Sequence, residues 1–321
     1  MPNLSMLTRH GIAIEPGFLG RGWSNHCQMP TPFRLNDSTI RMFFSSRDGR
    51  NRSNVFWVDV ESTPPFRIKG IAEHPALAPG KLGAFDSHGV MPTAVVPRND
   101  ELWMYYIGWT VRADVPYHNA IGVARSADGG RTFERLVPGP VVGTGPHEPY
   151  FCGTGDVAKI GDRWVIWYMS ATEWRIVAGK PEPRYHLKQA WSDDGIIWSQ
   201  DGQTAVDYEN DEEGGVARAT VLKRPDGYWM WFCHRGIADY RGRGANAYRL
   251  GIAHSSDGQN WKRLIKQPVF SFAPNPGDFD EFMECYPAAF EVGDAAYLFY
   301  NGSDFGQTGI GYATISDGVL G

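Results

Sequence analysis

The sequence predicts an all-β fold, a five-bladed β-propeller, and two observations support this prediction. One pattern occurs five times: an apolar strand, an aromatic-rich strand, a third strand ending near Ser-x-Asp-Gly, and a fourth strand rich in proline and glycine, which the fifth unit lacks. The residues that open the first strands lie 62, 63, 64 and 68 positions apart: Pro30, Pro92, Gly155, Ala219 and Pro287. A near-constant period with four short strands per unit is typical of a radial propeller.

The strands of each unit follow from residue type. Alternating β-branched and aromatic residues favour strands, and turn pairs such as Asn36-Asp37 and Gly161-Asp162 favour hairpins between them. The segments expected to carry strands are, in chain order, 29–37, 39–48, 53–61 and 65–75, then 90–109 and 119–136, then 155–171 and 187–199, then 217–236 and 249–264, then 286–304 and 308–318.

The fifth unit receives its missing strand from the N-terminus. The segment 11–17 (GIAIEPG) resembles LVPGPVV after the second unit and LIKQPVF after the fourth. We expect it to form the outer edge of the last blade, because such closure removes exposed strand edges. The chain is then one domain, 1–321, whose four-stranded antiparallel blades lie at roughly 24–75, 86–142, 149–206, 213–270, and 281–318 plus 7–17.

Three turns share the pattern Ser-x-Asp-Gly followed by an aromatic residue, at 126–133, 192–198 and 255–261. In each of them the Asp side chain can accept backbone N–H bonds, and the glycine can take a positive φ. We interpret these turns as structural staples.

Composition excludes several classes of function. A net charge of −5 argues against nucleic acid or an anionic membrane as the main partner. No apolar run approaches the roughly 20 residues of a membrane span, and the first residues carry no signal-peptide pattern. Four cysteines are too few for a disulfide framework, so we expect a cytoplasmic protein with reduced thiols.

Candidate site residues lie in two kinds of loop that share one face of a propeller. These are the lead-in loops before the first strands and the loops between the second and third strands. Four of the five lead-in loops carry carboxylates, and Asp86, Glu213 and Glu281 each stand six residues before a strand opening. Carboxylates that converge on one funnel suit glycosidic bond cleavage, although solvated loop carboxylates remain the alternative.

The predicted acid/base candidates are Asp86, Asp156, Glu284 and, next, Glu213. The predicted substrate-binding residues offer positioning groups or a stacking surface. They are His26, Arg47, Asp48, His88, Trp109, Glu173, Trp174, Arg175, Arg218, His234, Arg235, Tyr286 and Asp304.

No metal or cofactor is expected, because Cys-x-x-Cys and His-x-x-x-His spacings and phosphate-loop motifs are absent. A structural zinc near His26, His88 and the cysteines of the lead-in loops is the less favoured interpretation. A single ion on the axis beside His26 or His88 is a further alternative.

With its repeats, its turns and its loop acids, the chain resembles the five-bladed propeller glycoside hydrolases. These include the arabinanase/xylosidase (family 43), invertase (family 32) and mannoside phosphorylase (family 130) types. The resemblance implies that Asp86 matches the acid of the second unit and Asp156 that of the third. Glu284-Cys-Tyr-Pro287 is similar to the Glu-Cys-Pro of invertases with one residue inserted. The first unit, Asn25 to Pro30, offers no carboxylate in the corresponding slot.

The predicted function is therefore that of a glycoside hydrolase-like enzyme that acts on a carbohydrate, inverting if it hydrolyses. One alternative is a non-catalytic glycan-binding propeller, which the missing first acid favours. Another is glycosyl transfer or phosphorolysis, in which Arg47, Arg175, Arg218 and Arg235 hold phosphate or a charged sugar. A sialidase is disfavoured by the five-fold count, although 126–133 matches its Asp-box.

Overall fold

The computed structural model describes residues 7–20, 22–23, 26–264 and 269–316. Apart from one short helix, α1 (Ser303–Gly306), all regular secondary structure in this part of the chain is β-strand. Within it, no helix is long and apolar enough to cross a membrane. The predicted boundaries at 24–25, 265–268 and 317–318 lie outside the described residues.

Consecutive strands pair antiparallel in units of four, as predicted. Two larger sheets form because one single-residue parallel bridge joins β4 to β6 and another joins β12 to β14. The first unit consists of β2 (Gln28–Asn36), β3 (Thr39–Arg47), β4 (Ser53–Glu61) and β5 (Ile68–Ile71), and the second of β6 (Gly89–Arg98), β7 (Glu101–Thr110), β8 (His118–Ser126) and β9 (Glu134–Arg135). The third consists of β10 (Cys152–Ile160), β11 (Arg163–Val177), β12 (Lys180–Ser192) and β13 (Thr204–Val206), and the fourth of β14 (Glu213–Arg224), β15 (Gly227–Gly236), β16 (Arg249–Ser255) and β17 (Lys262–Arg263). The last consists of β18 (Cys285–Val292), β19 (Ala295–Asn301) and β20 (Ile310–Ile315) with β1 (Leu7–Ile14).

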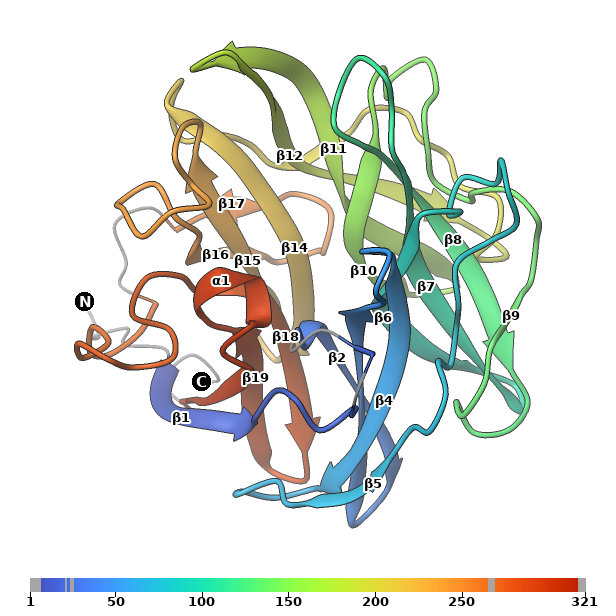
Figure 1. The fold of residues 1–321 in the computed structure, drawn as a ribbon, viewed down its shortest axis with the longest axis vertical. Coiled ribbons are helices and arrows are strands. Elements are labelled where there is room, and N and C mark those ends of the chain that lie inside the picture. The colour runs from blue at the N-terminus through green and yellow to red at the C-terminus, as the bar shows by residue number, and fades with distance from the viewer. Residues whose placement is uncertain (1–6, 21, 24–25, 265–268, 317–321) are drawn as a thin grey trace.

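The N-terminal strand completes the last sheet, as the sequence predicts. β1 pairs antiparallel with β20, from Leu7 opposite Ile315 to Ile14 opposite Ile310. Figure 1 shows this blue strand among the red C-terminal strands. Leu7 and Ile14 are buried while most residues between them alternate between intermediate and exposed, which is the pattern of a half-buried edge strand.

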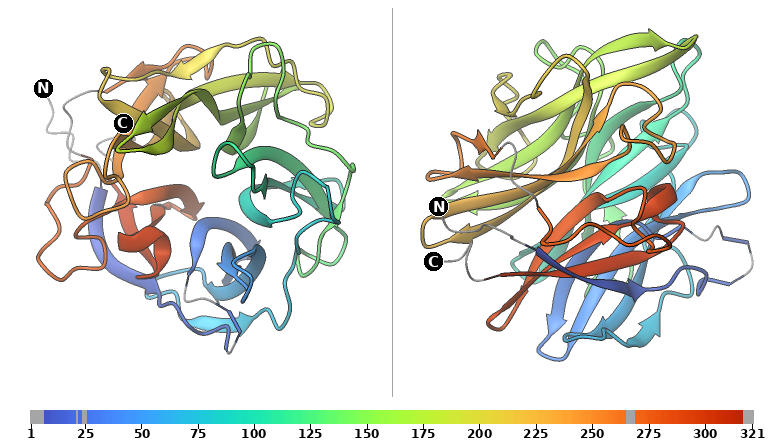
Figure 2. Two further views of the ribbon diagram at one scale, coloured as in Figure 1. Left: turned by 45° about the horizontal axis from the view of Figure 1, so that its top comes forward. Right: turned by 90° about the vertical axis from the view of Figure 1, so that its left-hand side faces the viewer.

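The first strands surround a common centre, and the sheets radiate from it (Figure 2, left). β2 contacts β6, β6 contacts β10, β10 contacts β14, β14 contacts β18, and β18 contacts β2. These contacts close a ring, which brings loops from distant parts of the chain to one mouth. Aromatic side chains such as Trp167, Trp231 and Phe43 fill the space between sheets and are fully buried.

The Ser-x-Asp-Gly turns are structural staples. Asp128 Oδ1 accepts the backbone N–H groups of Arg131 and Thr132 at 2.9 and 3.0 Å. Asp194 and Asp257 accept equivalent bonds in their own turns. Each turn thereby satisfies its own backbone at the rim of a sheet.

Candidate functional site

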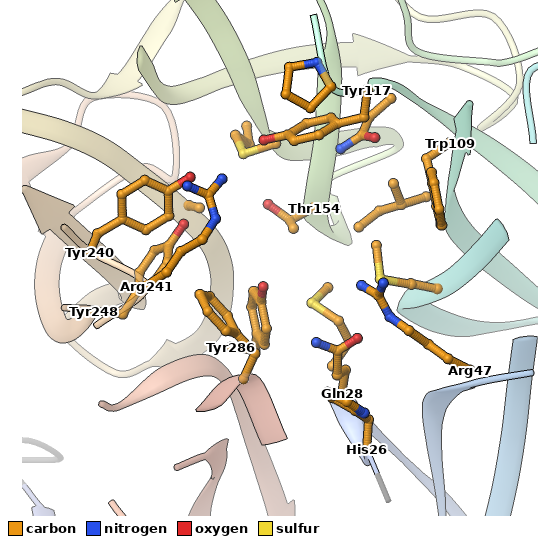
Figure 3. A pocket seen from close by; sticks show the side chains of 18 of the residues that line it. His26, Gln28, Arg47, Trp109, Tyr117, Thr154, Tyr240, Arg241, Tyr248 and Tyr286 are labelled. Atoms are coloured by element: carbon orange, nitrogen blue, oxygen red, sulfur yellow. The ribbon is translucent and has the colours of Figure 1, made fainter. Parts of the chain in front are cut away.

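A cavity of about 740 Å³ opens at the centre of the ring, and side chains from all of the four-stranded units line it (Figure 3). Its size is that of an ordinary small-molecule site. The lining residues are His26, Gln28, Met29, Arg47, Asn51, Met91, Ile107, Trp109, Val111, Pro116, Tyr117, Asn119, Thr154, Met169, Tyr185, Ala217, Tyr240, Arg241, Tyr248, Tyr286, Asp304, Phe305 and Gln307.

The floor of the cavity is built by β-bulges in the first strands. The pairing register of every first strand shifts next to the residue that opens it. A bulge bends its strand and re-aims a side chain. Met29, Met91, Thr154 and Tyr286 each stand one residue before an opening residue, and all four line the cavity.

Unusual backbone conformations gather at the same place. Five lining residues other than glycine adopt a positive φ: Met29 at 63°, Asn51 at 61°, Tyr286 at 54°, and Asp304 and Phe305 at 57° each. Bulky side chains in this region cost free energy, and such residues cluster at functional sites. This clustering supports the cavity as the functional site, independently of its shape.

One wall of the cavity is rich in tyrosines. Tyr117 borders it, and Tyr240 and Tyr248 stand beside Arg241 (Figure 3). The hydroxyls of Tyr185 and Tyr248 share a short hydrogen bond. The Tyr240 hydroxyl donates to Glu182 Oε2 at 2.8 Å. Burial raises the pKa of Tyr240 well above its ordinary value, so this hydroxyl stays protonated at neutral pH.

The opposite wall carries Arg47 and Trp109 (Figure 3). Trp109 Nε1 donates to Ser53 Oγ at 2.7 Å, and the Arg47 guanidinium lies 6.0 Å from its ring. Gly89 makes room for the indole, because a Cβ at this position would stand 2.1 Å from Trp109 Nε1. Arg47 Nη1 in turn donates to Asn51 Oδ1 at 2.8 Å, which aims the guanidinium.

His26 and Asp304 complete the set of titratable groups near Arg47. Burial and the charge of Arg47 lower the pKa of His26, and the charge of Asp304 acts in the opposite direction. His26 is therefore neutral at pH 7 and able to accept a proton. Asp304 is the one carboxylate that lines the cavity among the described residues.

The acids of the lead-in loops do not line the cavity. In four units a buried acid pairs with a cation on the third or fourth strand of its own unit; we call Asp86, Glu148, Glu213 and Asp280 the lead-in acids. The cations, in the same order, are Arg135 on β9, Lys188 on β12, Arg263 on β17 and Arg9 on β1.

A residue of the second strand supports each lead-in acid. Tyr106, Tyr168 and Tyr300 donate to Asp86, Glu148 and Asp280 at 3.1, 2.7 and 2.7 Å. In the fourth unit His234 Nδ1 takes this place, 2.9 Å from Glu213. The recurrence of Asp86 and Glu213 in the sequence thus belongs to a pairing that ties each lead-in loop to its own sheet.

The remaining acid candidates also lie outside the lining. Glu284 pairs with Arg9 at 2.5 Å. Asp156 accepts the backbone N–H groups of Val221 and Val157 at 2.7 and 2.9 Å, between two neighbouring first strands. Burial raises the pKa of Asp156 above its ordinary value.

The structure brings five predicted binding residues together in the cavity: His26, Arg47, Trp109, Tyr286 and Asp304. Arg235 and Trp174 lie behind the tyrosine wall, where Trp174 packs edge-on against Tyr117. Arg218 lies buried on the axis beneath the floor.

The other predicted binding residues are placed away from the cavity. Asp48 accepts the backbone N–H groups of its own turn, Glu173 pairs with Arg175 at 2.7 Å, and His88 lies 6.1 Å from the Trp109 ring on its outer side. His234 is engaged by Glu213.

Sequence reasoning missed much of the tyrosine wall. Tyr240 and Arg241 belong to the loop 237–248 between β15 and β16, which is one of the loops between second and third strands where site residues are expected. Its concentration of tyrosine, arginine and glycine was the available signal. Tyr248 is the last residue of the same loop and Tyr185 lies within β12, and nothing in their local sequence distinguishes them from core aromatics.

No group of three or more His, Cys, Asp or Glu side chains within the described residues is arranged to hold a metal ion. The four cysteines are buried as free thiols.

Two curated proteins match nearly the whole chain, and both are from Mycobacterium tuberculosis. They are uncharacterized protein MT1551 of strain CDC 1551 and uncharacterized protein Rv1502 of strain H37Rv. Each is 32% identical over 296 residues, which cover 92% of this chain and 94% of the relative. No protein-family model matches the chain.

Solved structures share the fold at low sequence identity. The RGII complex of BT0996 matches with a TM-score of 0.74 and 18% identity, covering 97% of this chain and 92% of the other. A structure from work on GH130 mannoside phosphorylases matches with a TM-score of 0.64 and 15% identity, covering 95% and 94%. Glycoside hydrolases of families 32 and 43 are also among the matches, so the predicted resemblance to propeller glycoside hydrolases is confirmed at the level of the fold.

Proposed function

The protein belongs to the family of the Mycobacterium tuberculosis proteins MT1551 and Rv1502, and from this premise we propose that it is a carbohydrate-active five-bladed propeller that binds a sugar in the axial cavity and acts on its glycosidic bond. The observation that carries the proposal is the cavity itself, where aromatic and polar side chains converge on a bulged, strained floor. The fold shared with glycoside hydrolases supports it, although fold alone does not assign a function.

The count of five blades rests on the ring of first strands. Each of the five strands β2, β6, β10, β14 and β18 contacts two others of the set, and each begins one antiparallel unit. In a five-bladed propeller, five loops of each kind lie at the cavity mouth.

The lining suits a sugar. Rings such as Trp109 and Tyr117 offer apolar faces for the C–H groups of a pyranose or furanose, while the amides of Gln28, Asn119 and Gln307 offer donors and acceptors for its hydroxyls. This combination of apolar faces and few convergent polar groups is that of an ordinary ligand site.

We assign proton transfer to Asp304, with neutral His26 beside it, rather than to Asp86, Asp156 or Glu284. Cleavage by two carboxyl groups requires both of them to flank the scissile bond. Among the described lining residues Asp304 alone supplies a carboxylate, and the predicted acids are engaged elsewhere. The Asp304 carboxylate therefore takes the proton of the attacking group, and that proton reaches the leaving oxygen by way of His26.

A glycan-binding propeller without catalysis is the second candidate. The observation in its favour is the same single carboxylate in the lining, since a binding protein needs no acid/base pair.

Aryl glycosides assayed with and without phosphate test the proposal. We expect turnover of at least one glycoside, and a loss of about 100-fold or more in Asp304→Asn, because a positioned general base contributes roughly that factor. Asp193→Asn is the matched control, because Asp193 is exposed and pairs only with Arg163 on an outer turn. Full activity in Asp304→Asn would contradict the assignment, and sugar binding without any turnover would support the second candidate.

A further inference from the structure

Two buried arginines stand behind the cavity without a carboxylate partner. Arg235 is only 2% exposed, and its guanidinium donates to Tyr185 Oη at 2.9 Å and to the Pro183 and Gly236 carbonyls at 2.6 and 2.8 Å. It lies 3.7 Å from the centre of the Tyr240 ring. No carboxylate of the described residues lies within 4.0 Å of it, and its direct partners are a hydroxyl, two carbonyls and aromatic rings.

Arg218 is the second of these cations, on the axis below the floor. It is also 2% exposed, and its Nη2 donates to the Pro30 carbonyl at 2.9 Å, while Nη1 donates to the Gly155 carbonyl at 3.2 Å and to Thr93. Burial lowers the pKa of Arg218 to about 10, so it is still charged at neutral pH. The described part of the protein places no carboxylate within 4.0 Å of its nitrogens, and Asp156 acts on it from a greater distance.

Two further arginines line the cavity directly. Arg47 and Arg241 extend toward the open space from opposite walls (Figure 3). Arg241 Nη1 donates to Glu182 Oε1 at 2.5 Å, and the rest of its half-exposed guanidinium makes no hydrogen bond to other described residues. It is thus anchored at one nitrogen and open to a ligand at the others.

Positive charge therefore predominates at this site although the protein is acidic overall. The net charge of the whole chain is −5, yet four arginines line or underlie the cavity, against Asp304 in the lining, Glu182 behind it and Asp156 near Arg218. A cavity with low-dielectric walls focuses the field of such groups and attracts ligands of opposite sign. Buried cations without an ionic partner are costly, and an anion in the cavity offsets part of that cost.

We propose that the cavity binds the anionic group of its sugar ligand, a carboxylate or a phosphate, with Arg241 as the direct contact and Arg235 and Arg218 as the source of the surrounding field. The inference rests on the proposed function, since it names the substrate class of the same site. A guanidinium suits both anions, because its planar donors bind two oxygens at once.

Calorimetric titration with matched ligands tests this proposal. The probes are glucose, galactose and mannose, each compared with its uronic acid and its 1-phosphate, together with inorganic phosphate alone. We expect the charged member of one series to bind about tenfold or more tightly than the neutral sugar, as charge-assisted hydrogen bonds require. Added salt should weaken only the charged ligand, and preference for the uronic acid or for the phosphate identifies the source of the anion.

Two variants with opposite expected effects on the affinity for the charged ligand extend the test. Arg241→Gln should weaken binding of the charged ligand by about tenfold and leave the neutral sugar nearly unchanged. Glu182→Gln keeps an acceptor for Tyr240 but removes a negative charge, so it should tighten binding of the charged ligand. Arg175→Gln is the control, because Arg175 lies outside the cavity and pairs with Glu173.

The possible outcomes distinguish the anion proposal from the proposed carbohydrate function. Equal affinity for neutral and charged sugars, or an unchanged affinity in both variants, overturns the anion proposal and leaves sugar binding standing. Binding of inorganic phosphate with no sugar of any series supports the anion site and contradicts the carbohydrate function. Binding of none of the probes overturns both.

Discussion

The lead-in acids and the residues that line the cavity differ in how they vary from one unit of the fold to the next. The lead-in acids recur from unit to unit, each in the same kind of place and each buried against a cation of its own sheet. The cavity residues differ from unit to unit. Trp109 and Arg47 form one wall, while tyrosines and Arg241 form the other.

This difference shows what repetition means in a repeat protein. A feature that holds a unit together recurs from unit to unit, as the ion pair between a lead-in acid and a later strand of its own unit does in four units. A ligand in the central cavity contacts several units at the same time, and each unit contacts a different part of the ligand. Irregular residues at the mouth are therefore better markers of function here than regular ones.

The largest expected effect is on stability, from breaking one lead-in pair. Asp86→Asn leaves Arg135 partly buried without its counter-ion, and breaking a buried pair costs about 3–5 kcal/mol in the free energy of unfolding. Denaturant titration measures this loss, and the affinity of the folded fraction for sugar should not change. A stable variant that has lost its sugar affinity would place Asp86 in the site instead.

In the fourth unit, the contribution of the lead-in pair to the stability of the fold depends on pH. Burial acts to raise the pKa of Glu213, but hydrogen bonds from Arg263 and His234 lower it to about 2 from an ordinary value of 4.5. The stabilisation is therefore complete above about pH 4.5 and is lost as the pH falls toward 2. Unfolding measured against pH should show Glu213→Gln less stable than the wild type above pH 4.5, with the gap closing in acid. A gap that stays constant down to pH 2 would show that the carboxylate is not ionised by this pairing.

A substitution in the cavity should lower the affinity for sugar, whereas a substitution of a lead-in acid should lower the free energy of unfolding. Trp109→Leu removes a stacking face and is expected to weaken sugar binding by about tenfold, the effect of one aromatic contact. Trp57→Leu is the matched control, since Trp57 is partly buried and donates to the Arg131 carbonyl far from the cavity. Equal affinities for the two variants would remove the Trp109 wall from the site.

The smallest effect is expected from an exposed pair on the same unit as Asp86. Arg125 and Glu134 lie 2.8 Å apart at the surface, and an exposed pair contributes about 0.2–1 kcal/mol. Arg125→Gln should therefore unfold almost as the wild type does. A loss as large as that of Asp86→Asn would mean that burial is not what makes the lead-in pairs important.

The sequence predicted the fold well because its signals were local and repeated. Strand alternation, the turn staples and the N-terminal edge strand all follow from short segments, and β1 pairs with β20 as expected. Of the predicted binding residues, Arg47, Trp109, Tyr286 and Asp304 line the cavity, and their role in binding stays a prediction.

The acids could not be sorted from the sequence, because their partners lie far along the chain. Asp86 and Arg135 are 49 residues apart, and Arg9 meets Glu284 across 275 residues. A carboxylate that awaits a substrate and one that is already paired have the same local sequence. Tyr185 was missed for the same reason: it meets Tyr248 of the next unit across 63 residues of sequence.

A crystal structure of the protein with a sugar that binds in solution would test the position of the site without any intermediate step. We predict electron density for the sugar in the axial cavity, between Trp109 and the wall formed by Tyr117 and Tyr240, with Asp304 beside the glycosidic bond. Density against Asp86, Glu213 or Glu284, with the axial cavity left to solvent, would contradict this prediction.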